Sequence, residues 1–109
     1  MTAYPNLFSP ISIGPMTSKN RILMSAMSIN FGVDGSGFVT DQLTAYFEAR
    51  ARGGVGAMLV GGGAVDPSGI ELPELPRLWD DACIPAMARM VVALPPIRVI
   101  RPSTPSLSP

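Results

Sequence analysis

Two stretches of small residues are the part of this sequence best suited to chemistry. Ser25-Ala26-Met27-Ser28 closes one apolar run, and Gly61-Gly62-Gly63 follows the next one. Small side chains let a flat aromatic ligand approach the backbone, where exposed amides can bond its polar ring atoms. Met27 would pack under such a ring through its polarisable sulfur, and Ser28 would hydrogen-bond a carbonyl or a ring nitrogen. The alternative is that Met27 belongs to the core and the glycines form a tight turn, which composition alone favours.

Other catalytic and binding chemistries find little support. The chain has no histidine, which excludes triad chemistry and a histidine zinc site, and its single cysteine, Cys83, forms no internal disulfide. Gly54-Val55-Gly56 precedes a strand and matches no dinucleotide motif, and no Gly-Lys-Ser/Thr sequence follows the later glycine run. We expect Cys83 to be a buried, inert thiol. We expect Asp80-Asp81 to cap a helix rather than to bind a metal.

The charge balance and the hydropathy limit the partners. Eight Lys and Arg residues balance eight Asp and Glu residues, so no electrostatic argument favours nucleic acid or an acidic membrane surface. The first ten residues do not resemble a signal peptide, and no apolar run approaches the roughly 18 to 20 residues of a membrane span. We therefore expect a soluble, cytoplasmic protein with neither nucleic acid nor membrane partners.

Strand-like runs alternate with helical spacing along the chain. Short continuous apolar runs indicate strands buried on both faces, and apolar residues three or four apart indicate helices. This alternation predicts an α/β fold, a parallel sheet with covering helices. The two stretches of small residues would follow neighbouring strands, about 5 Å apart, and face the same pocket. The predicted elements are a hairpin within Leu7–Pro15, a strand at Arg21–Met27, a helix from the N-cap Thr40 to about Arg52, a strand at Val55–Val60, and a helix between Asp80-Asp81 and Pro95-Pro96.

The last 15 residues differ in composition from the rest. They hold 5 of the 12 prolines and no acidic residue. Ile97–Ile100 would suit a short strand, but prolines flank this segment on both sides, and the composition favours a disordered tail. We therefore divide the chain into a folded part, residues 1–94, and a Pro/Ser-rich, disordered tail, residues 95–109.

Five pieces of the sequence, taken in order over about residues 7–90, resemble the Old Yellow Enzyme family, also called the NADH:flavin oxidoreductase/NADH oxidase family. The resemblance implies the first two βα units of a partial (β/α)8 TIM barrel that binds FMN non-covalently. It implies that Ser25, Ala26, Met27 and Ser28 lie along the flavin ring and that Gly62 contacts the flavin through its backbone. The matching pieces are Leu7–Pro10 with Ile13-Gly14, Lys19–Met27, Val39–Asp41 with Tyr46 and Arg50, Arg52–Gly56, and Ala64–Gly69 with Trp79–Asp81.

The resemblance also implies a reaction. In this family NAD(P)H reduces FMN, and the flavin passes a hydride to a small-molecule acceptor such as an activated alkene or an enoyl thioester. Relatives usually carry proline at the position of Ala26. Because a TIM barrel needs about 250 residues, we expect the 109-residue chain to be a truncated, inactive fragment with no catalytic residue of its own. The alternative is a non-catalytic interaction module, or a remnant, that needs a partner chain to complete the barrel.

Overall fold

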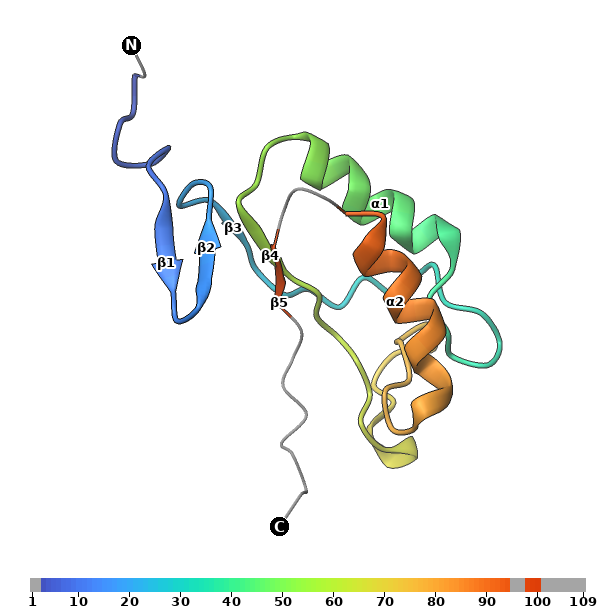
Figure 1. Cartoon of the computed structure of the whole chain (residues 1–109). Helices are drawn as coiled ribbons and strands as arrows, with labels where there is room; N and C mark the ends of the chain where they lie inside the picture. Colours follow the sequence, from blue (N-terminus) through green and yellow to red (C-terminus); the bar gives the residue numbers. More distant parts are fainter. Residues whose placement is uncertain (1–2, 95–97, 101–109) are drawn as a thin grey trace.

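The fold begins with a two-stranded antiparallel hairpin (Figure 1). The computed structural model describes residues 3–94 and 98–100. Strand β1 (Ile11–Ile13) pairs with strand β2 (Met16–Ser18). Gly14 turns the chain between them at φ 57°, a left-handed conformation that glycine adopts without steric cost. A hairpin is therefore present as predicted, but it spans Ile11–Ser18, and its second strand lies beyond the predicted range Leu7–Pro15.

A three-stranded parallel sheet follows, with strand order β3-β4-β5. The strands succeed one another in chain order, with one α-helix between each pair, which is the repeating unit of an α/β barrel. Three strands do not close a barrel. The elements are β3 (Leu23–Met24), α1 (Asp41–Arg52), β4 (Ala57–Leu59), the 3-10 helices η1 (Pro67–Gly69) and η2 (Asp81–Cys83), α2 (Ile84–Val92) and β5 (Arg98–Ile100).

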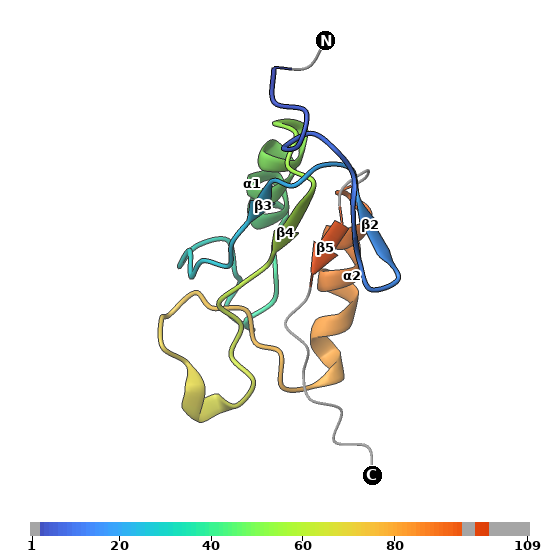
Figure 2. The same ribbon diagram turned by 90° about the vertical axis from the view of Figure 1, so that its left-hand side faces the viewer.

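Both α-helices pack on the same face of the sheet, and the core lies between them and the strands (Figure 1, Figure 2). Phe47 of α1, Met58 of β4 and Met90 of α2 are fully buried there. Side chains alternate between the two faces of a strand. Met24 packs against this core, whereas its neighbour Leu23 is 50% exposed. Helices on one face only are typical of a barrel wall, because a doubly wound sheet carries helices on both faces.

A buried asparagine ties the sheet together at the end where the parallel strands begin. The Nδ2 atom of Asn20 donates to the carbonyl of Gly54 at 2.8 Å, and its Oδ1 atom accepts from the amide of Ile22 at 3.0 Å. The Ser18 hydroxyl donates to the Asn20 carbonyl at 2.7 Å. Gly56 lies so close that an added Cβ would overlap the side chains of Asn20 and Ser18. This cluster joins the hairpin, β3 and β4.

Two details differ from the sequence-based predictions. Both β3 and β4 are shorter than the predicted strands, because apolar patterning continues past the last ladder hydrogen bonds and does not report where pairing ends. Thr40 precedes α1 as predicted, but its side chain caps no helical amide. Its hydroxyl instead donates to the carbonyl of Gly32 at 2.7 Å and holds the preceding loop.

The disordered tail predicted for residues 95–109 is wrong for Arg98–Ile100, which form β5. This strand pairs in parallel with β4, and Val99 lies opposite Met58. The open edge of β4 offers backbone donors and acceptors, and pairing with them outweighs the proline-flanked composition of the segment. Residues 95–97 and 101–109 lie outside the described residues, so the division of the chain at residue 94 stays a prediction.

Candidate functional site

The two stretches of small residues lie side by side, as predicted. We call Ser25–Ser28 the first rim and Gly61–Gly63 the second rim. They follow β3 and β4, which are parallel neighbours, so both rims leave the sheet at the same edge. A Cβ added at Gly61 would overlap the Cβ of Ala26 and would lie 3.0 Å from the amide nitrogen of Met27. Only glycine therefore lets the second rim approach the backbone of the first.

Gly62 makes a second close approach. Its φ of 75° lies in the left-handed region, which disfavours other residues. An added Cβ would lie 2.8 Å from the hydroxyl oxygen of Ser28 and 3.0 Å from the Cδ2 atom of Leu75. The glycine run is thus a packing requirement at two successive positions, which sets the spacing between the rims.

The first rim is open to solvent. All four of its side chains are exposed, and Met27 is 47% exposed. The alternative in which Met27 belongs to the core is therefore wrong. The Met27 amide and the Ser28 hydroxyl bond to no other described residue. The thioether of Met27 suits the face of a flat aromatic ligand. The Met27 amide and the Ser28 hydroxyl suit its polar edge.

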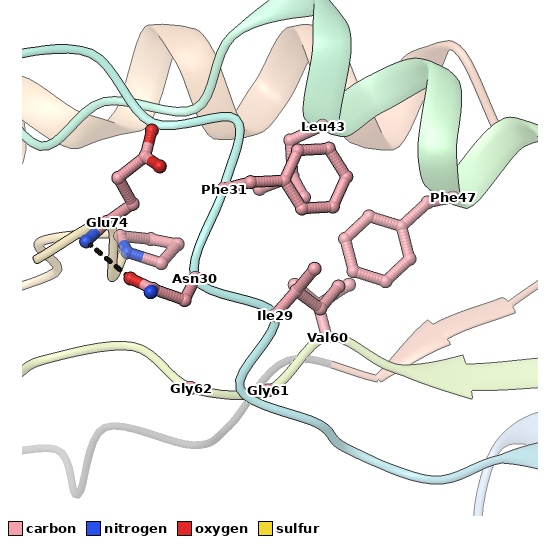
Figure 3. A pocket seen from close by; sticks show the side chains of 10 residues that line it. Ile29, Asn30, Phe31, Leu43, Phe47, Val60, Gly61, Gly62 and Glu74 are labelled. Carbon is pink, nitrogen blue, oxygen red and sulfur yellow. Dashed lines mark hydrogen bonds between the residues drawn. The ribbon is translucent and has the colours of Figure 1, made fainter. Parts of the chain in front are cut away.

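A loop that precedes η2 backs the second rim. The Oδ1 atom of Asn30, two residues beyond the first rim, accepts from the amide of Glu74 at 3.0 Å (Figure 3). The amide of Ala64 donates to the carbonyl of Pro76 at 2.8 Å, and the amide of Leu78 donates to the carbonyl of Ala64 at 2.7 Å. Asn30 was not among the site residues predicted from the sequence. The available signal was an amide side chain just after the first rim, of a residue type that tolerates a left-handed backbone.

A small cavity lies behind the rims, toward α1. Its volume is about 10 Å³, and Gly61 and Gly62 form part of its wall. Leu43 and Phe47 reach it from α1, and Val60 reaches it from the residue just after β4 (Figure 3). A single water needs roughly 10–15 Å³, so the cavity admits no aromatic ring. A flat ligand at this site would have to lie on the exposed side of the first rim.

The remaining candidate groups have structural roles. The Oδ1 atom of Asp80 accepts from the amide of Ala82 at 2.8 Å and caps η2, which confirms the predicted capping. Burial, followed by the charge of Asp80, raises the pKa of the half-buried Cys83 thiol. Cys83 is thus only partly buried, whereas the sequence predicted a buried thiol. A protonated thiol is a poor nucleophile, and the inertness of Cys83 stays a prediction. Within residues 3–94 and 98–100, no group of side chains could hold a metal ion. No helix in that part of the chain has the length and apolar character needed to cross a membrane.

Known proteins match most of this chain. The model of the NADH:flavin oxidoreductase / NADH oxidase family matches residues 6–95. A metal reductase of Desulforamulus reducens is 40% identical over 88 residues, which are 81% of this chain and 13% of that protein. An NADH oxidase of Thermoanaerobacter brockii is 43% identical over 82 residues, 74% of this chain and 12% of that protein. An NADPH dehydrogenase of Bacillus subtilis is 37% identical over 84 residues, 77% of this chain and 25% of that protein.

Solved structures share the fold. An old yellow enzyme homologue from Zymomonas mobilis superposes with a TM-score of 0.79 at 25% identity, over 89% of this chain and 27% of that one. A 2-naphthoyl-CoA reductase in complex with 2-naphthoyl-CoA superposes with a TM-score of 0.78 at 29% identity, over 84% of this chain and 14% of that one. The chain spans 12% to 27% of the length of these relatives. Its strands and helices correspond to part of the (β/α)8 barrel of the solved structures, as predicted. The chain belongs to the NADH:flavin oxidoreductase / NADH oxidase family, whose cofactor is FMN and whose reductant is NAD(P)H, as the resemblance implied.

Proposed function

We propose that this chain provides part of the FMN site of an NAD(P)H-dependent oxidoreductase. The flavin ring would lie along the first rim, in contact with Ser25, Ala26, Met27 and Ser28, and would touch the backbone of Gly62. The observation that carries this proposal is the exposed first rim, which packs tightly on the glycines of the second rim. A ring placed there meets backbone and small side chains rather than a bulky group.

The groups on the rims fit a flavin ring. The exposed Met27 side chain offers a polarisable sulfur to the ring face. The Ser28 hydroxyl and the Met27 amide, which have no partner among the described residues, would donate to ring carbonyls or nitrogens. Phe47 and Val60 are buried behind the rims and make that side apolar. FMN supplies the hydride chemistry when bound, and the protein supplies binding and orientation.

The proposed acceptor is a small electron-poor molecule, either an activated alkene or an enoyl thioester. Support comes from the solved 2-naphthoyl-CoA reductase, which holds an aromatic CoA thioester. An acceptor of this class is flat near the reacting carbons, so it would stack on the flavin face that points away from the first rim. The chain itself would contact such an acceptor only at the edge of the flavin.

We further propose that the 109 residues alone turn over no NAD(P)H. In TIM barrels the phosphate frequently binds near strands 7 and 8, whereas the described residues form three parallel strands. A site that contacts the flavin ring but has no anchor for the FMN phosphate binds FMN weakly. The uncovered sheet face, where Leu23 is 50% exposed, also favours the second candidate function, a module that needs a partner chain to complete the barrel. Co-purification of such a chain would support that candidate.

An NMR titration tests the flavin proposal on the chain as it stands. FMN should shift the amide signals of Met27, Ser28 and Gly62, and riboflavin, which lacks the phosphate, should shift the same signals. Ser28→Ala should weaken this binding by about three- to tenfold, the value of one hydrogen bond. Ser36→Ala removes a similarly exposed serine from a distant loop and should have no effect.

Two outcomes would contradict these proposals. Flavin-induced shifts confined to residues away from both rims would overturn the site. Steady oxidation of NADPH by the purified chain with FMN would overturn the proposed lack of turnover, and the absorbance of NADPH and of the flavin would report it directly.

A further inference from the structure

We propose that Asn30 is a positioning residue that holds the two rims at a fixed spacing, so that the flavin ring meets both at once. This inference rests on the proposed function, because it concerns the same site. Asn30 itself would not touch the flavin. It would act through the loop that backs the second rim.

The backbone of Asn30 has the first unusual feature. Among the described residues it is the non-glycine residue with a positive φ, at 58°. Asparagine tolerates this conformation better than most residues, because its short polar side chain can compensate through local hydrogen bonds. The turn lies two residues beyond Ser28, so it directs the chain away from the first rim and back toward α1.

The side chain of Asn30 makes the connection between distant segments. Its Oδ1 atom accepts from the amide of Glu74 at 3.0 Å, across 44 residues of sequence (Figure 3). The next residue, Leu75, is buried, and its Cδ2 atom lies 3.0 Å from the position of a Cβ on Gly62. The hydrogen bond therefore holds Leu75 against the second rim.

The same loop is then fastened to the chain that leaves the second rim. The amide of Ala64 bonds to the carbonyl of Pro76, and the amide of Leu78 bonds to the carbonyl of Ala64. A continuous path of contacts thus runs from the first rim through Asn30 and Glu74 to Ala64, just after Gly63. Without the Asn30 bond, the end of this loop near Glu74 loses its connection to the first rim.

Two substitutions separate the hydrogen bond from the backbone conformation. Asn30→Gly keeps the left-handed backbone and removes the acceptor, whereas Asn30→Asp tolerates the backbone and keeps an oxygen acceptor. In the chain without flavin, we expect Asn30→Gly to speed amide exchange at Glu74 and across Gly62–Ala64 by about three- to tenfold, as loss of one exposed hydrogen bond implies. Exchange at the buried core residues of α1 should not change.

The flavin titration supplies the second measurement. Asn30→Gly should weaken FMN binding several-fold and reduce the shift at Gly62 more than the shift at Met27, because the second rim moves away from the ring. Asn30→Asp should restore both shifts. Unchanged exchange at Gly62–Ala64 in Asn30→Gly, or an Asn30→Asp variant that behaves like Asn30→Gly, would overturn the role of Asn30.

The outcomes distinguish this inference from the proposed function. If FMN shifts the amide signals of both rims in the unaltered chain but binds Asn30→Gly equally well, only the role of Asn30 is overturned. If FMN shifts the amide signals of neither rim in the unaltered chain, the proposed function is overturned and the flavin-directed role of Asn30 with it.

Discussion

The hydroxyl of Ser28 lies 2.8 Å from the place that a Cβ on Gly62 would occupy, so the two rims meet without room for one more carbon. This contact joins residues that are far apart in sequence. It exists because two parallel strands end at the same edge of the sheet and the second is followed by glycine. The stability of this edge and the flavin binding proposed for it therefore depend on the same few atoms.

Gly62→Ala should destabilise the chain by about 1–3 kcal/mol, since it combines backbone strain at a positive φ with the steric conflict at Ser28. Thermal unfolding followed by circular dichroism would measure the loss. Gly35→Ala is the matched control, because Gly35 has no atom within 4 Å of an added Cβ, and it should leave the melting temperature unchanged or slightly higher. Equal melting temperatures for the two variants would show that the rims are not closely packed.

Asn20→Ala should lower the free energy of unfolding by about 1–3 kcal/mol, because it leaves the carbonyl of Gly54 and the amide of Ile22 without their partner in a buried place. Urea denaturation is the appropriate measurement. Asn6→Ala, at an exposed asparagine near the N-terminus, should change the free energy by less than about 0.5 kcal/mol. A loss of similar size in both variants would contradict a specific role for the buried amide.

Thr40→Val should cost about 1 kcal/mol, because the Gly32 carbonyl loses the hydroxyl that donates to it at 2.7 Å. Thr40→Ser keeps the hydroxyl and should retain most of the stability, so the pair isolates this hydrogen bond from the loss of a methyl group. The midpoints of urea unfolding would compare them. If Thr40→Val unfolds at the same urea concentration as the unaltered chain, the hydroxyl does not hold the loop.

The adjacency of the two rims was predictable from the sequence, and the contacts that brace them were not. Parallel strands put their carboxyl ends at one edge, so any two successive strands followed by small residues predict adjacent rims. The bond from Asn30 to Glu74 depends on how a loop 44 residues away folds back, and no local pattern reports that. The hydrogen bond of Thr40 could not be predicted either. Thr40 stands at the N-cap of α1, but its hydroxyl donates to the carbonyl of Gly32 and caps no helical amide.

The course of the chain near its C-terminal end shows a second limit of local patterns. Prolines around Arg98–Ile100 argue against a strand when only the segment is considered, yet the segment pairs with β4. Pairing is decided by the partner's open edge, which the local composition does not contain. Hydrophobic periodicity predicted α1 and α2 correctly, because an amphipathic helix buries one face whichever element packs against it.

The thiol of Cys83 should make the free energy of unfolding depend on pH in the alkaline range. Burial and the nearby Asp80 raise its pKa in the folded state, so the folded chain favours the neutral thiol. Unfolding restores the ordinary thiol pKa of about 8.5. The neutral thiol therefore stabilises the folded state fully below about pH 8.5. This stabilisation is lost as the pH rises through the higher pKa that Cys83 has in the folded state. Cys83→Ala should reduce the fall in the free energy of unfolding between neutral and alkaline pH.

Alkylation kinetics provide the direct test of the raised thiol pKa. At mildly alkaline pH the folded chain should react with iodoacetamide more slowly than the urea-unfolded chain, because the thiolate is the reacting form. Asp80→Asn keeps an oxygen that can accept from the Ala82 amide but removes the charge, so it should speed alkylation partway toward the unfolded rate. Since burial is the larger cause of the shift, Asp80→Asn should not reach that rate. Equal rates for the folded and unfolded chains would show that Cys83 lies in an environment no different from water.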